Sequence, residues 1–209
     1  MDRNDFGRIP DDLWQELSAR LPQQIRGQKG GRPRIADRQV ITGIVYRLRT
    51  GCQCKAIPTQ FGSGSTCHRR FQQWQQAGGF RAIFAALVGY DDRARGIDWR
   101  WASLDSAMAK SPKGGDCTGP NPTDRAKLGV KRHVLSVPVA IGITAANVHD
   151  KRLAEPMMDA VVVRDGPAVV RPTNLCLDKG SDYPDVDAAI RARGIVPHIR
   201  RRGETRRSR

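Results

Sequence analysis

The sequence has no long apolar stretch and no leader-like start. None of its segments approaches the roughly 18 consecutive apolar residues that a membrane-spanning helix requires. The opening residues, MDRNDFGRIP, lack the apolar core of a secretory signal. Internal repeats and long low-complexity segments are also missing. These absences exclude a membrane protein and predict an intracellular, cytoplasmic one.

The cysteines form neither a disulfide framework nor a regular zinc motif. There are five of them, scattered along the chain, and an odd number agrees with a reducing compartment. The one set that could hold zinc is Cys52, Cys54, Cys67 and His68. A C-x-C pair followed by an adjacent Cys-His does not match the two-pair spacing of zinc sites. We therefore expect small core cysteines.

Acidic residues are scarce relative to basic ones. The 209 residues include 36 Lys and Arg but 21 Asp and Glu, which gives a formal net charge of +15. A hydrophobic content of 39% still allows a substantial core. Some soluble proteins are simply basic and well solvated, but a surplus of this size on a small chain indicates a polyanionic partner. Nucleic acid is the commonest such partner, so we expect a nucleoid-associated, DNA-binding protein.

The first half of the chain has apolar residues at helical spacing. Four helices are predicted, and they start near Pro10, near Ile35, at a cap formed by Ser65 or Thr66, and after Gly78-Gly79. Gly51 is expected to end the second helix. This pattern predicts a helical DNA-binding domain over residues 1–95.

The third predicted helix resembles the recognition helix of a helix-turn-helix module. Its apolar residues, Cys67, Phe71 and Trp74, are expected to face inward. Its polar residues are expected to face outward, and the candidate DNA contacts among them are His68, Arg69, Arg70 and Gln73. The alternative is that these side chains only solvate an amphipathic helix.

A basic, glycine-rich segment, RGQKGGRPR at residues 26–34, lies between the first two helices. It contains no acid, and its four basic residues are Arg26, Lys29, Arg32 and Arg34. A short arm of this kind can enter a narrow minor groove, where negative potential is concentrated. The alternative is a solvated linker.

The second half, residues 96–209, has the pattern β-β-β-α-β-α-β. Strands are predicted at residues 99–105, 127–135, 137–145, 174–178 and 195–199. A polar loop is expected at 109–126, and helices precede the fourth and fifth strands. Antiparallel strands followed by parallel crossovers are the order of an RNase H-like sheet. The fold class is therefore predicted to be α+β.

Two aspartates end predicted strands of this sheet. Asp105 ends the first strand and Asp178 ends the fourth, and these strands can be neighbours. Two carboxylates ~4 Å apart repel by about 4 kcal/mol at an effective dielectric near 20, so the pair needs a proton or a metal. Magnesium prefers such oxygen ligands, and two ions can drive phosphodiester chemistry. The alternative is that each Asp is a turn former or helix cap.

Four motifs carry a family resemblance: TGCQCKAIPTQFG, GPNPTDRAKLGVKRH, ITAANVHD and LDKGSDY. They resemble the insertion-sequence-five family of bacterial DDE transposases over nearly the whole chain. The resemblance implies an N-terminal DNA-binding region, an RNase H-like catalytic domain, and Mg²⁺ or Mn²⁺ held by two aspartates and a glutamate. By motif, the aspartates are Asp105 and Asp178. The basic strand that would meet the DNA contains Lys127, Lys131, Arg132 and His133.

The sequence departs from this family at two places. The family's glutamate lies on a helix after the last strand, whereas this sequence continues as RRRGETRRSR, with Glu204 as its one acid after Asp187. The expected hairpin KRHVLSVPVA also lacks the Gly, Asn or Asp of a two-residue turn, which predicts that a few residues are missing there. The first departure predicts a C-terminally truncated copy without its third carboxylate. Both departures together fit a decayed copy, or a first reading frame whose remainder needs frameshifting, whereas recombinant truncation explains only the first.

The leading hypothesis is DNA transposition. The protein would bind the terminal inverted repeats of an insertion sequence and, if complete, would catalyse metal-dependent strand cleavage and transfer at a target site. The alternative is a catalytically inactive DNA-binding protein, a repressor or remnant, that occupies element ends. An RNA-binding protein is disfavoured because no RNP-type aromatic strand is visible. The sequence does not specify the oligomeric state and leaves a homodimer open.

Overall fold

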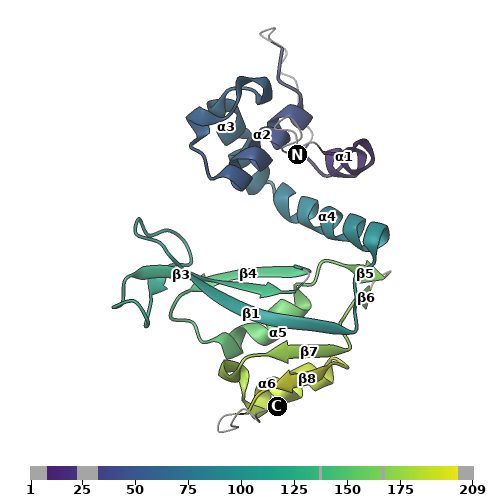
Figure 1. Ribbon diagram of the computed structural model, residues 1–209, viewed down its shortest axis with the longest axis vertical. Coiled ribbons are helices and arrows are strands. Elements are labelled where there is room, and N and C mark those ends of the chain that lie inside the picture. The colour runs from purple at the N-terminus through teal and green to yellow at the C-terminus, as the bar shows by residue number, and fades with distance from the viewer. Residues whose placement is uncertain (1–8, 23–32, 137, 166–167, 202–209) are drawn as a thin grey trace, which may run out of the picture. The chain divides into compact units, whose positions relative to one another are not determined.

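The computed structural model describes residues 9–22, 33–136, 138–165 and 168–201. The chain divides into two compact units, Met1–Tyr90 and Asp91–Arg209 (Figure 1). The boundary predicted at residue 95 coincides with the last residue of a helix that begins in the first unit and ends in the second. Within the described residues, no helix has the length and apolar character needed to cross a membrane.

The N-terminal unit is helical. Its helices are α1 (Asp11–Ser18), α2 (Asp37–Thr50), α3 (Gly64–Gln76) and α4 (Gly79–Arg95), with short 3-10 turns η2 (Cys54–Ala56) and η3 (Thr59–Phe61) between α2 and α3. The inward stripes of these helices meet in one core. That core contains Ile9, Leu17, Leu21, Val40, Ile41, Ile44, Ile57, Cys67, Trp74, Ile83 and Ala86.

The predicted end of α2 is confirmed, but the predicted cap of α3 is wrong. Gly51 has a left-handed φ of 67°, and its N–H donates to the carbonyl of Arg47. The cap of α3 is Ser63, whose Oγ accepts from the N–H of Thr66 at 3.2 Å. The first residue of the helix is glycine because a Cβ at position 64 would lie 1.9 Å from the carbonyl oxygen of Cys54. This close approach of two backbone segments leaves no signal in the local sequence.

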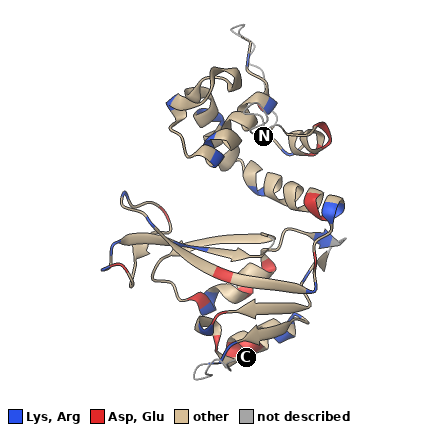
Figure 2. Cartoon of the chain, in the orientation of Figure 1, with Lys and Arg blue, Asp and Glu red and all other residues tan. Residues whose placement is uncertain are grey.

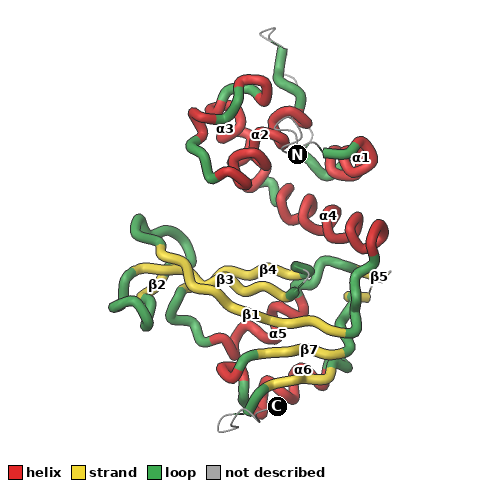
Figure 3. The backbone as a smooth tube through the Cα atoms, viewed as in Figure 1, coloured by secondary structure: helices red, strands yellow, loops and turns green. Residues whose placement is uncertain are grey.

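The C-terminal unit is built on a mixed six-stranded sheet (Figure 3). Its strands are β1 (Trp101–Lys110), β2 (Gly119–Pro120), β3 (Leu128–Leu135), β4 (Ala140–Ala145), β7 (Asn174–Leu177) and β8 (Val196–Ile199). The order is β2-β3-β1-β7-β8, with β4 paired to β3. β3 is antiparallel to β1 and to β4, whereas β7 is parallel to β1 and β8 is parallel to β7.

Helices cover one face of this sheet. The helical elements are η4 (Asp150–Leu153), α5 (Ala154–Asp159), η5 (Lys179–Ser181) and α6 (Pro184–Ala192), and a small hairpin joins β5 (Arg164–Asp165) to β6 (Ala168–Val169). α5 packs on β3 and β4, and α6 packs on β8. The opposite face exposes apolar side chains of Trp101, Val134, Ile141, Ile143 and Val196. The predicted combination of a helical half and a mixed sheet is therefore observed.

Strand β1 is longer than predicted. It continues past Asp105 to Lys110 because the segment SAMAK pairs with β3, from Leu104↔Leu135 to Lys110↔Gly129. The hairpin from β3 to β4 also closes with the residues present. Leu135 pairs with Ala140, and the N–H of Val139 donates to the carbonyl of Leu135 at 3.0 Å. A four-residue connection does not require the glycine of a two-residue turn, so the expectation of missing residues was wrong.

The loop before β3 contains two consecutive non-glycine residues with positive φ, Arg125 (50°) and Ala126 (57°). A left-handed conformation costs an L-residue about 1–2 kcal/mol. Glycine avoids this cost, but its more flexible unfolded chain lowers the free energy of unfolding by about 0.4–1 kcal/mol. We therefore expect Ala126→Gly to stabilise the C-terminal unit by about 0.5–1 kcal/mol in urea unfolding. Ala107→Gly, in the extended strand β1, is the control and should destabilise it. A lower midpoint for Ala126→Gly would contradict this account.

The N-terminal unit contains its own core, so we expect residues 1–95 to fold when expressed alone. The expected result is a cooperative thermal transition followed by circular dichroism, because the core side chains pack among themselves. A fragment that melts without a cooperative transition would show that the helices need the sheet unit.

Candidate carboxylate site and nucleic-acid interface

Asp105 and Asp178 occupy adjacent positions on neighbouring strands. β1 and β7 pair in parallel from Trp101↔Asn174 to Leu104↔Leu177, and the two aspartates are the next residue on each chain segment. Neighbouring strands lie about 4.8 Å apart, so the two carboxylates originate side by side. Both residues are exposed. The structure thus brings together the two acids that the sequence singled out, although Asp105 lies inside its strand rather than at the end.

In each carboxylate, one oxygen accepts a hydrogen bond from the described residues and the other does not. Oδ1 of Asp105 accepts the N–H of Ser106 at 2.8 Å, and Oδ1 of Asp178 accepts the hydroxyl of Ser181 at 3.5 Å. Gly180 makes room here, because a Cβ at that position would lie 3.0 Å from Oδ1 of Asp178. The Oδ2 atoms have no hydrogen-bond partner among the described residues. An oxygen on each aspartate is therefore available to a cation.

The donor set fits a hard divalent cation but is small. Within the described ranges, no group of three or more His, Cys, Asp or Glu side chains could hold a metal ion. Mg²⁺ is often bound through one or two carboxylates, with water in most other positions. The residues that contain Glu204 lie outside the described part of the chain.

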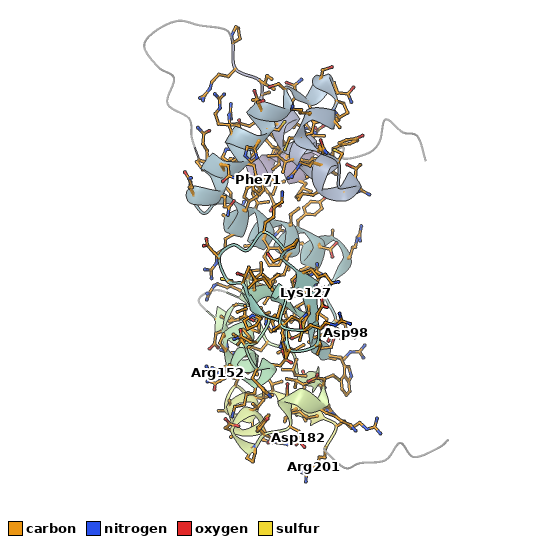
Figure 4. The ribbon with its side chains drawn as sticks, turned by 90° about the vertical axis from the view of Figure 1, so that its left-hand side faces the viewer. Phe71, Asp98, Lys127, Arg152, Asp182 and Arg201 are labelled. Atoms are coloured by element: carbon orange, nitrogen blue, oxygen red, sulfur yellow. The ribbon has the colours of Figure 1, made fainter. Side chains whose placement is uncertain are left out.

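Two of the four basic residues predicted on the DNA-facing strand are buried instead. Lys131 is 5% exposed and His133 is fully buried, so the prediction that they lie on an exposed, DNA-facing surface is wrong. Alternate residues of a strand point to opposite faces, and these two lie on the face that α5 covers. Arg132, between them, is exposed on the other face. Lys127, which is labelled in Figure 4, lies just before the strand and is exposed. Contacts of Arg132 and Lys127 with DNA stay predictions.

Lys131 and His133 form buried polar contacts. Nζ of Lys131 donates to the carbonyl of Val148 at 2.9 Å and lies 3.0 Å from Oδ1 of Asp150. The ring of His133 lies between two hydroxyls, with Nδ1 2.7 Å from Ser106 Oγ and Nε2 2.8 Å from Thr144 Oγ1. Burial lowers the pKa of His133, and the nearby Asp150 opposes this shift.

The segment that Lys131 holds also contacts the residues after Asp178. Nε2 of His149 lies 3.3 Å from the hydroxyl of Tyr183. The ammonium of Lys151 lies 4.5 Å from the centre of the Tyr183 ring and 3.3 Å from a carboxylate oxygen of Asp185. The motifs ITAANVHD and LDKGSDY thus meet beside the carboxylate pair. Both motifs are visible in the sequence, but no local pattern there predicts a role for these side chains.

On α3, the predicted outward face is correct except at Arg70. His68, Arg69 and Gln73 are exposed, but Arg70 is only 3% exposed and forms an ion pair with Asp37 at the start of α2. Its guanidinium carbon also lies 6.0 Å from the centre of the Trp74 ring. Arg70 falls on the inward stripe, three residues after Cys67 and four before Trp74. The prediction of an outward Arg70 was wrong because residue type was weighed above helical spacing.

The basic arm is described only at its end. Arg34 is exposed, just before α2, whereas Arg26, Lys29 and Arg32 lie outside the described residues. Figure 2 shows further Lys and Arg on the helices of the N-terminal unit and in the loop between β1 and β3. Basic side chains are therefore presented by both units.

Comparisons with known proteins identify the family. The profile described as "Putative transposase of IS4/5 family" matches residues 9–84. The Burkholderia cepacia "Insertion element IS402 uncharacterized 16.2 kDa protein" is 32% identical over 118 residues, which cover 54% of this chain and 80% of that protein. The chain belongs to this family of insertion-sequence transposases.

Two further similarities are partial. The "Putative transposase for insertion sequence element IS402" of Burkholderia cepacia is 39% identical over 106 residues, which cover 47% of this chain and 48% of that protein. The match thus spans about half the length of that relative. A solved "Mos1 transposase paired-end complex with left transposon end" has a TM-score of 0.32 and 9% identity over 84% of this chain and 61% of that one. A TM-score this low supports no conclusion about the fold.

Proposed function

We propose that this protein acts in DNA transposition, with the helical unit binding the ends of an insertion sequence and an RNase H-like unit providing the carboxylates for strand cleavage and transfer. The observation that carries the proposal is the placement of Asp105, on β1, beside Asp178, which directly follows the parallel neighbour β7. The strand order supports the RNase H-like assignment, because three antiparallel strands are followed by two parallel ones.

The DNA-binding role rests on exposed basic and amide side chains. In the helical unit these are Arg34, His68, Arg69 and Gln73, and in the sheet unit Lys127 and Arg132. Arginines suit phosphates and guanine edges, while glutamine suits adenine. If ~6 phosphate contacts form, the logarithm of affinity should fall with the logarithm of salt concentration at a slope near −5.

In the sheet unit, Asp105 and Asp178 would hold Mg²⁺ or Mn²⁺ through their open oxygens. A bound ion would polarise the phosphodiester and help to activate the attacking hydroxyl. The described residues supply two carboxylates for this role. Positioning and charge stabilisation dominate such chemistry, so a missing third ligand costs orders of magnitude in rate. The second candidate function is a DNA-binding protein that occupies element ends without cutting them, because two carboxylates are all that the described residues place at this site.

We expect the purified chain to bind duplex DNA carrying its element ends but to nick it little or not at all with Mg²⁺ or Mn²⁺. Asp105→Ala and Asp178→Ala are the matched controls, measured in the same gel assay. Robust nicking that both substitutions abolish would overturn the expected inactivity and would require a third acid, from Glu204 or from a partner subunit. Absence of DNA binding at low salt would overturn the proposed function itself.

A further inference from the structure

The N-terminal unit contains a cavity of about 270 Å³ where the segment preceding α2 meets the start of α3. The lining residues are Pro33, Arg34, Ile35, Ser63, Thr66, Arg69 and Arg70. Three of the seven are arginines and none is an acid. The volume lies just below the ~300 Å³ at which ordinary small-molecule pockets begin, and the lining is not predominantly apolar. These properties are those of an anion site rather than of a pocket for an apolar ligand.

The three arginines at this cavity differ in whether an acid of the protein pairs with them. Arg70 is buried and forms an ion pair with Asp37, so its charge is already balanced within the protein. Arg34 and Arg69 are exposed, and neither has an ion-pair or hydrogen-bond partner among the described residues. Two arginines from separate chain segments therefore line one space, and neither is paired with an acid among the described residues. An anion that enters between two such cations is attracted by both.

Hydroxyl groups add donors to the same wall. Ser63 Oγ lies 2.9 Å from Thr66 Oγ1 and accepts the N–H of Thr66 at 3.2 Å. This pair fixes the first turn of α3 beside the cavity. The positive end of the helix dipole favours an anion there, in addition to the two arginines. Guanidinium groups match the oxygens of a phosphate in bidentate geometry, which a lysine ammonium does not.

We propose that this cavity seats a single phosphate of the DNA backbone, held jointly by Arg34 and Arg69. This inference rests on the proposed DNA-binding function and specifies one of its contacts. A shared phosphate would fix the basic arm at a set distance from α3 along the DNA. The arm would then be held in register with the bases that α3 reaches, instead of contacting the backbone at random.

A double-mutant cycle on the full chain tests the shared phosphate. Duplex DNA affinity is measured by fluorescence anisotropy against salt for wild type, Arg34→Gln, Arg69→Gln and the double variant. Arg81→Gln on α4 is the matched control, because it is exposed and has no partner among the described residues. Each single change should weaken binding about tenfold, as expected for a charged hydrogen bond. The double variant should stay within about threefold of the singles, because one phosphate is lost only once.

The salt dependence separates one phosphate from two. The slope of log affinity against log salt should change by about one in the double variant, whereas two independent phosphates would change it by about two. Inorganic phosphate should also raise the melting midpoint of wild type and of Arg81→Gln above that in chloride of equal ionic strength, but not that of the double variant. Unchanged midpoints in chloride would verify that the exposed substitutions leave the fold intact.

The possible outcomes distinguish the two levels of inference. If the affinity losses of the two single variants multiply in the double variant and the salt slope changes by about two, Arg34 and Arg69 do not share one phosphate, although DNA binding itself still stands. Loss of the phosphate effect in Arg81→Gln would overturn the shared phosphate as well. Wild-type chain that binds no duplex DNA would overturn the proposed function, and phosphate stabilisation lost only in the double variant would then assign the seat to free phosphate.

Discussion

Replacing Lys131 by methionine is expected to lower the free energy of unfolding of the sheet unit by about 3 kcal/mol, the cost of breaking a buried ion pair from one side. The Oδ1 atom of Asp150 is buried and accepts no hydrogen bond within the described structure, so it depends on the ion pair with Lys131. The carbonyl of Val148 would also lose its donor. Methionine matches the length of the lysine stem, so the loss reports the charge rather than a cavity.

Lys127→Met is the matched control for this experiment. Lys127 is exposed and lies 4.0 Å from a carboxylate oxygen of Asp124, and such surface pairs contribute between zero and about 1 kcal/mol. Guanidinium unfolding of the full chain should show a large shift for Lys131→Met and little for Lys127→Met. Equal stability of the two variants, together with lower DNA affinity for Lys131→Met, would restore Lys131 as a DNA contact.

Replacing Arg70 by alanine is expected to destabilise the helical unit by about 3 kcal/mol. The change removes a buried guanidinium and its stem, and it leaves the carboxylate of Asp37 without its ion-pair partner. Arg69→Ala is the natural control, because the neighbouring side chain is exposed and unpaired among the described residues. It should leave the melting midpoint unchanged and weaken DNA binding about tenfold.

A second comparison separates the ion pair from simple packing. The double variant Asp37→Asn/Arg70→Met replaces both charges and keeps most of the buried volume. It should recover part of the stability that Arg70→Ala loses, since no unpaired carboxylate is left. If the double variant is less stable than Arg70→Ala, the ion pair is not the cause of the destabilisation.

Much of the architecture could be predicted because apolar spacing and chain order determine it. The stripe ending at Gly51 indicated α2, and two apolar strands ending near Asp105 and Asp178 indicated neighbours in one sheet. The length of β1 could not be predicted in this way. Its continuation to Lys110 is extended because β3 supplies hydrogen-bond partners, and those partners lie elsewhere in the sequence.

The errors at the candidate site have a common cause. Arg70 was assigned to DNA as part of the polar face of its helix, and Lys131 through the family resemblance, yet each lies on the inward side of its element by spacing alone. Buried Arg70 pairs with Asp37, which is distant in sequence, and buried Lys131 pairs with Asp150, which belongs to another motif. Helical and strand periodicity would have indicated inward positions. The pairing that makes such burial tolerable could be seen only in the structure.

The central place of β1 in the sheet has a consequence for biosynthesis. The ribosome releases β1, β3 and β4 in succession, and these antiparallel neighbours can associate early, before β7 exists. Until β7 arrives, one edge of β1 is an unpaired row of backbone donors and acceptors, open to strands of other nascent chains. Asp105 lies on that open strand, and Asp178 joins it only with the late, non-local pairing. Translation that pauses or stops before Asn174 would therefore release an aggregation-prone sheet fragment and not a smaller working domain.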